Sequence, residues 1–214
     1  LVFTNHHCGF SSIQQHSSVE HDYLKDGFFA RSLEEELPNP ELYVRFLLRT
    51  ENVTKRVLSA AKHAKTESER RVAVDSVMNV IGMEVSEKDS TLTGIVDAYY
   101  AGNEFWLSVY RDYNDVRLVF APPSSVGKFG WDTDNWMWPR HTGDFSVFRV
   151  YAGPDNRPAA YSPQNVPYRP KKHFSISTKG VKEGDFTMIY GFPGNTQEYI
   201  LSDAVAYIAE RSDP

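Results

Sequence analysis

The sequence predicts a β-rich α+β fold, and three observations support this prediction. The 214 residues include 13 Phe, 12 Tyr and 4 Trp, and such an aromatic content favours β-structure over a helical bundle. Short runs of β-branched and aromatic residues, separated by turn residues, fill 93–123 and return at 144–153. A long stretch from 38 to about 81 instead has a helical period. With 41% hydrophobic residues, the chain can bury one sizeable core or two small ones.

The first residues predict a strand that ends in a turn. The apolar run LVF stops at Thr4 and Asn5, so residues 1–8 should form a strand that enters a turn. Residues 9–37, which carry "EHDYLKDGFFA", read as mixed loop.

A helical insertion is expected near 38–90. "NPELYVRFLLRT" offers an Asn-Pro helix start, and Val53, Val57 and Ala61 follow at spacings of four. "ESERRVAVDSVMNVIG" repeats the helical period, with Gly82 as a candidate C-cap.

Strands should dominate the rest of the chain. In chain order the patterns predict a meander over 93–123 split at Gly102-Asn103 and near Asp115, a strand at 144–153, a Pro-rich linker, strands at 173–178 and 184–194, and a helix at 195–211 capped by Asn195.

Charge and hydropathy exclude some functions. The net charge is −5 without a basic cluster, so the electrostatic footprint of a nucleic-acid-binding protein is missing. No apolar run approaches the roughly 20 residues of a membrane span, and no signal peptide stands at the start. A single cysteine excludes an intrachain disulfide. Because the chain opens without Met inside an apolar run, we expect it to be part of a longer protein.

Three motifs carry candidate chemistry. "TNHHC" places His7 where the first strand breaks, "TGDFSVFRV" places Asp144 before a strand, and "VKEGDFTMIYGFPG" runs into a Gly-Pro loop. A histidine at a strand end can deprotonate a hydroxyl, and a nearby aspartate can fix its tautomer and stabilise the imidazolium. This order resembles serine peptidases of the chymotrypsin-like clan, in which His precedes Asp and both precede Ser.

Longer strings sharpen the resemblance. "LVFTNHHCGFSSIQQHSSVEHDYLKDGFFA", "DTDNWMWPRHTGDFSVFRVYAGPDNRPA" and "GFPGNTQEYI" are similar to the bacterial serine dipeptidyl-peptidases of the dipeptidyl-peptidase 7 and 11 family. The resemblance implies a partial chymotrypsin-like double β-barrel. Residues 1–165 would then hold the first barrel with its helical insertion, 166–194 the opening strands of the second barrel, and 195–214 the start of a helical domain.

The same resemblance implies roles for individual residues. His7 would be the general base and Asp144 its orienting acid, with His6 as the alternative base. Asn135 and Trp136 would hold the free amino terminus of the peptide substrate, because an amide oxygen can accept from an ammonium group and an indole can line its site. No metal or organic cofactor is implied. A periplasmic or secreted location and a possible homodimer follow from the resemblance alone.

The nucleophile has no counterpart in this sequence. The serines closest to the clan's Gly-x-Ser-Gly setting are Ser124, Ser125 and Ser177, and none lies downstream of "GFPG". We therefore expect the chain to carry the His-Asp part of a serine exopeptidase that releases dipeptides, and to be inactive by itself. An endopeptidase of the same clan and a non-enzymatic peptide-binding domain are the alternatives.

Other readings of the histidine turn are simpler. His6 and His7 could be ordinary buried or capping residues. A zinc site of His7, Cys8, His16 and His21 has suitable ligand types, but its spacing matches no familiar structural zinc pattern. Cys8 itself is expected to be a small buried residue.

Overall fold

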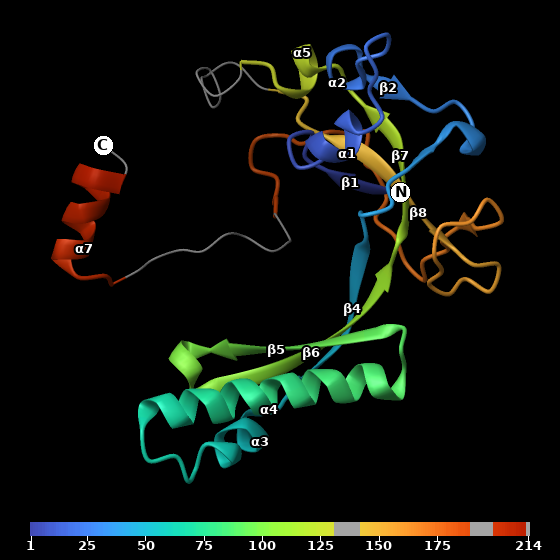
Figure 1. Cartoon of the computed structure of the whole chain (residues 1–214). Coiled ribbons are helices and arrows are strands. Elements are labelled where there is room, and N and C mark those ends of the chain that lie inside the picture. Colours follow the sequence, from blue (N-terminus) through green and yellow to red (C-terminus); the bar gives the residue numbers. More distant parts are fainter. Residues whose placement is uncertain (131–141, 189–198, 213–214) are drawn as a thin grey trace. The chain divides into compact units, whose positions relative to one another are not determined.

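The computed structural model describes residues 1–130, 142–188 and 199–212. The chain divides into two compact units, Leu1–Lys171 and Lys172–Pro214, and both are drawn in Figure 1. Within the described ranges, no helix has the length and apolar character needed to cross a bilayer. The first unit holds two antiparallel sheets with helices packed on them, which confirms the β-rich α+β class.

The first sheet brings the start of the chain beside a strand from its middle. Its six strands are all paired antiparallel, in the order β1-β8-β7-β2, with β3 also on β7 and β9 also on β8. Their bounds are β1 Val2–Thr4, β2 Phe28–Phe29, β3 Leu37–Pro38, β7 Asp115–Ala121, β8 Ser146–Ala152 and β9 Val166–Pro167. Because Thr4 pairs with Ser146, the turn after β1 and the segment before β8 emerge at the same end of the sheet.

Short helices cover this sheet. They are α1 Phe10–Gln14, α2 Tyr23–Asp26, the 3-10 turn η1 Leu33–Glu35, and α5 Ser124–Gly127 directly after β7. The core beneath α1 and α2 is formed by Ile13, Leu24, Val116, Leu118, Ala121 and Phe148. Fully burying one such aliphatic side chain stabilises the fold by about 1.5–3 kcal/mol.

The second sheet has the order β4-β6-β5 and is covered by two helices. The elements are β4 Val44–Asn52, α3 Thr54–Ala60, α4 Glu67–Lys88, β5 Leu92–Tyr99, the 3-10 turn η2 Tyr100–Gly102 and β6 Glu104–Tyr113. Figure 1 shows α4 lying along β5 and β6. Thr66 caps α4 by accepting from the backbone N–H of Glu69, whose carboxylate accepts from the backbone of Lys65. The predicted strands at the start of the chain, over 93–123 and at 144–153 are confirmed. The predicted meander over 93–123 is wrong, because β5 and β6 form a hairpin in the second sheet whereas β7 joins the first sheet.

Part of the predicted helical insertion is a strand. Residues 44–52 form β4, paired with β6 along its length, and only α3 and α4 are helical. The register shifts between Leu47 and Arg49, so the extra residue Leu48 interrupts the alternation of inward and outward side chains. At the bulge the sequence reads FLL, and this apolar run interrupts the two-residue period by which a strand is recognised.

Gly82 does not end its helix as predicted, because α4 continues to Lys88. A Cβ at Gly82 would lie 2.7 Å from the carbonyl oxygen of Gly94, and a Cβ at Gly94 would lie 2.8 Å from that of Gly82. The two glycines therefore allow α4 to approach the backbone of β5 closely.

A buried ionic network ties the strands of the first sheet to each other and to the loop before β3. Glu36 accepts from Arg149 at 2.7 Å and from the Tyr151 hydroxyl at 2.8 Å. Arg117 donates to both carboxylate oxygens of Asp115 and stacks on the Tyr151 ring at 3.7 Å. Each buried charge thus has a partner, as burial in low dielectric requires.

The second unit differs from its expected secondary structure. Its described residues up to 188 contain no strand, although strands were predicted at 173–178 and from 184 onward. A strand needs a hydrogen-bonding neighbour, and these segments find none in the described part of the chain. The predicted closing helix is shorter, as α7 Ser202–Tyr207 followed by the π-helical turn η3 Ile208–Ser212. Asn195, its expected cap, lies outside the described residues, and the expected domain boundaries stay predictions.

Candidate active site

The turn after β1 carries His7 and is fixed against β8. The backbone N–H of Gly9 donates to the carbonyl of Asn5 at 3.1 Å. A Cβ at Gly9 would lie 2.7 Å from the hydroxyl oxygen of Ser146, so only glycine allows the turn to come this close to the strand. The Ser146 hydroxyl in turn donates to the Asn5 carbonyl at 3.4 Å.

Asp144 approaches from the other side, just before β8. The backbone N–H of Gly143 donates to the carbonyl of Val126 at 3.0 Å, and the Thr142 hydroxyl donates to the same oxygen at 2.8 Å. These bonds fasten the segment before Asp144 to α5, and the ring of Phe145 stacks on Phe120 just after it.

His7 and Asp144 meet through two hydrogen bonds. Nδ1 of His7 lies 2.7 Å from Oδ2 of Asp144, and the backbone N–H of His7 donates to Oδ1 at 3.2 Å. The His7 side chain is 55% exposed and that of Asp144 is 23% exposed. An ionised carboxylate only accepts, so Nδ1 carries the proton and Nε2 presents its lone pair. Among the described residues no group hydrogen bonds to Nε2.

The Asp144 carboxylate is held in its ionised form. Burial acts to raise its pKa, but the hydrogen bonds from the backbone and ring of His7, the attraction of that ring and a bond from Asn5 outweigh burial and lower the pKa below its usual value. The ionised carboxylate can therefore stabilise a positive charge that develops on His7 when Nε2 takes a proton.

His6 is fully buried, whereas the His7 side chain is exposed. Burial lowers the pKa of His6, against an opposing attraction from Asp144. The geometry therefore favours His7 over His6 as the histidine that Asp144 orients, whereas the catalytic roles of His7 and Asp144 remain predictions.

The remaining candidates have mixed outcomes. Asn135 and Trp136 lie outside the described residues, as does the Gly-Pro loop at 191–194. Cys8 is exposed, so its expected burial is wrong. Among the residues that the structure describes, no three His, Cys, Asp or Glu side chains gather as a metal site would require, and the zinc alternative gains no support.

Sequence reasoning missed α5, whose residues contact the segments that precede His7 and Asp144. Ser124 and Ser125 were considered only as nucleophiles, and the Ser124 hydroxyl instead donates to the carbonyl of Leu24 at 2.6 Å. The signal that was present is the Pro-Pro-Ser-Ser sequence after a strand, since Pro ends strand pairing and is common at the start of a helix.

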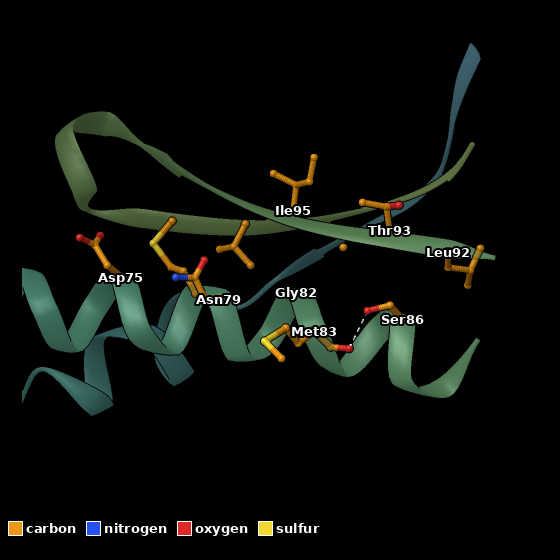
Figure 2. A pocket seen from close by; sticks show the side chains of 11 residues that line it. Asp75, Asn79, Gly82, Met83, Ser86, Leu92, Thr93 and Ile95 are labelled. Atoms are coloured by element: carbon orange, nitrogen blue, oxygen red, sulfur yellow. Dashed lines mark hydrogen bonds between the residues drawn. The ribbon is translucent and has the colours of Figure 1, made fainter. Parts of the chain in front are cut away.

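A large cavity lies away from this pair, between α4 and β5. Its volume is about 820 Å³, and Figure 2 shows side chains from the helix and the strand on its two sides. Asp75 is the one ionisable residue in its lining, so the cavity offers no acid–base pair. A smaller cavity of about 320 Å³ adjoins the histidine turn and is lined by residues that include Thr4, Cys8 and Gly9.

The fold and the pair define a class of protein. The antiparallel β-rich domain presents a histidine whose ring is hydrogen bonded to an ionised aspartate, an arrangement that also occurs in Ser-His-Asp hydrolases. The family model described as Peptidase S46 matches residues 1–214, and the chain belongs to this peptidase family.

Relatives with two different names are similar to the chain. An Asp/Glu-specific dipeptidyl-peptidase of Capnocytophaga gingivalis is 53% identical over 215 residues, which cover 100% of this chain and 30% of that protein. A dipeptidyl-peptidase 7 of Porphyromonas endodontalis is 54% identical over 202 residues, which cover 94% of this chain and 25% of that protein. The chain therefore spans less than a third of the length of these relatives.

Two solved structures are also similar to the chain. The crystal structure of Porphyromonas endodontalis DPP11 in complex with the dipeptide Arg-Glu matches with a TM-score of 0.86 at 45% identity, over 97% of this chain and 30% of that chain. A second crystal structure, with the dipeptide Arg-Asp, matches with a TM-score of 0.87 at 46% identity and the same 97% and 30% coverage.

Proposed function

We propose that this chain is the His-Asp portion of a serine-type dipeptidyl-peptidase, which releases dipeptides from the free amino terminus of oligopeptides. The observation that carries the proposal is the two-point contact between His7 and Asp144. Its support from outside the site is the Peptidase S46 match and the names of the relatives. Because the two differently named relatives are about equally similar to the chain, at 53% and 54% identity, the proposal specifies dipeptide release and leaves the side-chain preference open.

The proposed mechanism is acyl transfer through a serine that lies outside this chain. Nε2 of His7 takes the proton of the serine hydroxyl as the oxygen attacks the peptide carbonyl. Asp144 keeps the His7 proton on Nδ1 and stabilises the imidazolium, which then protonates the departing amine. A water molecule, deprotonated by His7, then attacks the acyl-enzyme. The serine is regenerated and the dipeptide is released.

Exopeptidase action requires that the substrate's amino terminus be captured. We assign this role to Asn135 and Trp136, on the resemblance of "DNWMWPRHTGDF" to the family. An amide oxygen accepts from the ammonium group, and an indole face attracts a cation. A substrate with a blocked terminus would lose both interactions.

The wider context of the intact protein follows from the same resemblance. We propose a chymotrypsin-like double barrel to which residues 1–165 contribute the first barrel, a periplasmic or secreted location, and a homodimer. These proposals rest on the resemblance alone, and size-exclusion chromatography and cell fractionation of the intact protein test the last two.

The test of function uses the intact protein that contains this chain. Dipeptide release is followed by mass spectrometry from peptides with free or acetylated amino termini, for wild type, His7→Ala, Asp144→Ala and Asn135→Ala. We expect cleavage of free-amine peptides only, loss of turnover in the first two variants, and a weaker amine preference in the third. His63→Ala, which removes an exposed histidine of the second-sheet region, is the matched control and should keep full activity.

The other possible outcomes would support a different function or refute the assignment of the base. Equal cleavage of acetylated peptides would favour an endopeptidase. Peptide binding without turnover in the wild type would favour a non-enzymatic peptide-binding domain. Full activity of His7→Ala would refute the assignment of the base.

A further inference from the structure

The short helix α5 contacts the residues that precede each member of the His-Asp pair. On one side, the Val126 carbonyl accepts from the backbone of Gly143 and the hydroxyl of Thr142, just before Asp144. On the other side, Gly127 lies against the ring of His6, just before His7. The helix itself is fixed to the sheet-covering helix α2 through the bond from Ser124 to the Leu24 carbonyl. One element therefore sets the positions of the residues that precede the base and the acid.

The contact between His6 and Gly127 is tight. A Cβ at Gly127 would lie 2.6 Å from Cγ and 2.7 Å from Cδ2 of His6, far inside van der Waals contact. The ring is fully buried and cannot move into solvent to make room. Only glycine at this position therefore allows the ring to lie on the helix backbone.

The His6 ring and both of its nitrogen atoms are buried against α5. Among the described residues, neither ring nitrogen has a partner at hydrogen-bonding distance and angle, although the Pro122 carbonyl is close enough to favour a protonated ring. A buried imidazole without full hydrogen bonding costs about 1–3 kcal/mol relative to one with partners. The described contact that fixes the ring is its packing on the Gly127 backbone.

Burial lowers the pKa of His6 and favours its neutral form, although the largest charge effect, that of Asp144, opposes this. The groups that act on it are the carboxylate of Asp144, the ammonium of Lys128 and the ring of His7, and burial is the strongest influence. A neutral His6 does not compete with His7 for the Asp144 carboxylate, as a charged neighbour would.

We propose that His6 is a positioning residue, whose ring packs on the Gly127 backbone of α5 and thereby holds the adjacent His7 where Nδ1 meets Asp144. This proposal rests on the proposed function only for its kinetic test. His6 and His7 are joined by one peptide unit, so a shift of the buried ring shifts the base. A displacement of about 1 Å in a catalytic group can cost about 10²-fold in rate.

The test is a set of variants in the intact protein. Gly127→Ala should lower kcat by about 10²-fold with little change in KM, because the new methyl group displaces the His6 ring. His6→Ala removes the ring and should lower kcat as well. The double variant should cost no more than the larger single effect, because both changes act through one contact. Gly82→Ala is the matched control: its methyl group would lie 2.7 Å from the Gly94 carbonyl, in the second sheet, so it should lower the melting temperature and leave kcat unchanged.

A second readout does not depend on peptide cleavage. The proton shared by His7 Nδ1 and Asp144 should give a far-downfield proton NMR signal in the wild type and in Gly82→Ala. The signal should be lost or shifted in Gly127→Ala and His6→Ala, and lost in Asp144→Asn.

The outcomes separate the two proposals. If the wild type releases no dipeptides but the signal behaves as expected, the proposed function fails and the role of His6 stands. If Gly127→Ala keeps both kcat and the signal, or if the costs of the two single variants multiply in the double variant, the positioning role is refuted. Should Gly127→Ala fail to fold, His6→Ala decides the matter alone, since an unchanged signal in that variant refutes the proposal.

Discussion

Replacing Asp144 with asparagine tests the geometry of the site most directly. The change keeps the size of the side chain and an oxygen that can accept from the His7 backbone, which now lies 3.2 Å from Oδ1. The amide NH₂ would take the place of Oδ2, which now lies 2.7 Å from Nδ1 of His7. Because an NH₂ group cannot accept from Nδ1–H, the ring should shift its proton to Nε2, and the free lone pair that acts as base is lost.

The expected cost in rate is large and the cost in stability is small. Placing the wrong tautomer in an otherwise intact Ser-His-Asp site lowers kcat by about 10⁴-fold, which corresponds to about 5.5 kcal/mol of activation free energy. The folded state loses one charge-assisted hydrogen bond, and the Asp144 side chain that makes it is 23% exposed. We therefore expect a decrease of about 1 kcal/mol in the free energy of unfolding.

The assay measures kcat and KM of the intact protein on a free-amine peptide, together with its thermal unfolding. Asp112→Asn is the matched control, since Asp112 is 20% exposed and is bonded twice to Arg45 at 2.7 Å in the second sheet. That variant should lose similar stability and keep its kcat. A folded Asp144→Asn variant that retains more than about a tenth of the wild-type kcat, a cost of less than 1.4 kcal/mol, would refute the role of Asp144.

Two further predictions concern stability, measured by chemical denaturation of the intact protein. Glu36→Ala should lower the free energy of unfolding by about 3 kcal/mol, because it leaves Arg149 and the hydroxyl of Tyr151 without their partner. The control Glu51→Ala breaks an exposed ion pair and should lower it by less than about 1 kcal/mol. Equal losses in the two variants would contradict the importance of the buried network. Burial raises the pKa of Tyr113 from 10.0 to about 12, so the stability that its neutral form provides should be full below pH 10 and be lost as the pH rises toward 12. Tyr113→Phe should weaken this alkaline loss, and an unchanged pH profile would count against it.

Local patterns predicted the elements whose partners are close in sequence. The β5–β6 hairpin follows from β-branched and aromatic runs that turn residues separate. The next strand along the chain, β7, pairs with β8 in the other sheet, so the predicted meander ends at β6. The patterns failed where a distant contact decided the structure. Leu48 forms a bulge because β4 pairs with β6, more than fifty residues further on. Gly82 lies within α4 because Gly94 of β5 is close to it, and no local rule places that strand there.

The sequence by itself determined the chemical groups of the candidate site and their order along the chain. "TNHHC" and "TGDF" supplied a histidine and an aspartate in the order that a serine peptidase uses. Only the tertiary structure decided which of two adjacent histidines meets the aspartate, 137 residues away. The pairing of β1 with β8 brings the two segments together, and α5 holds them with His7 outward and His6 buried. The physical reason is that a sequence motif specifies donors and acceptors, whereas the distance and orientation between them depend on backbone pairings and close contacts that only the folded chain makes.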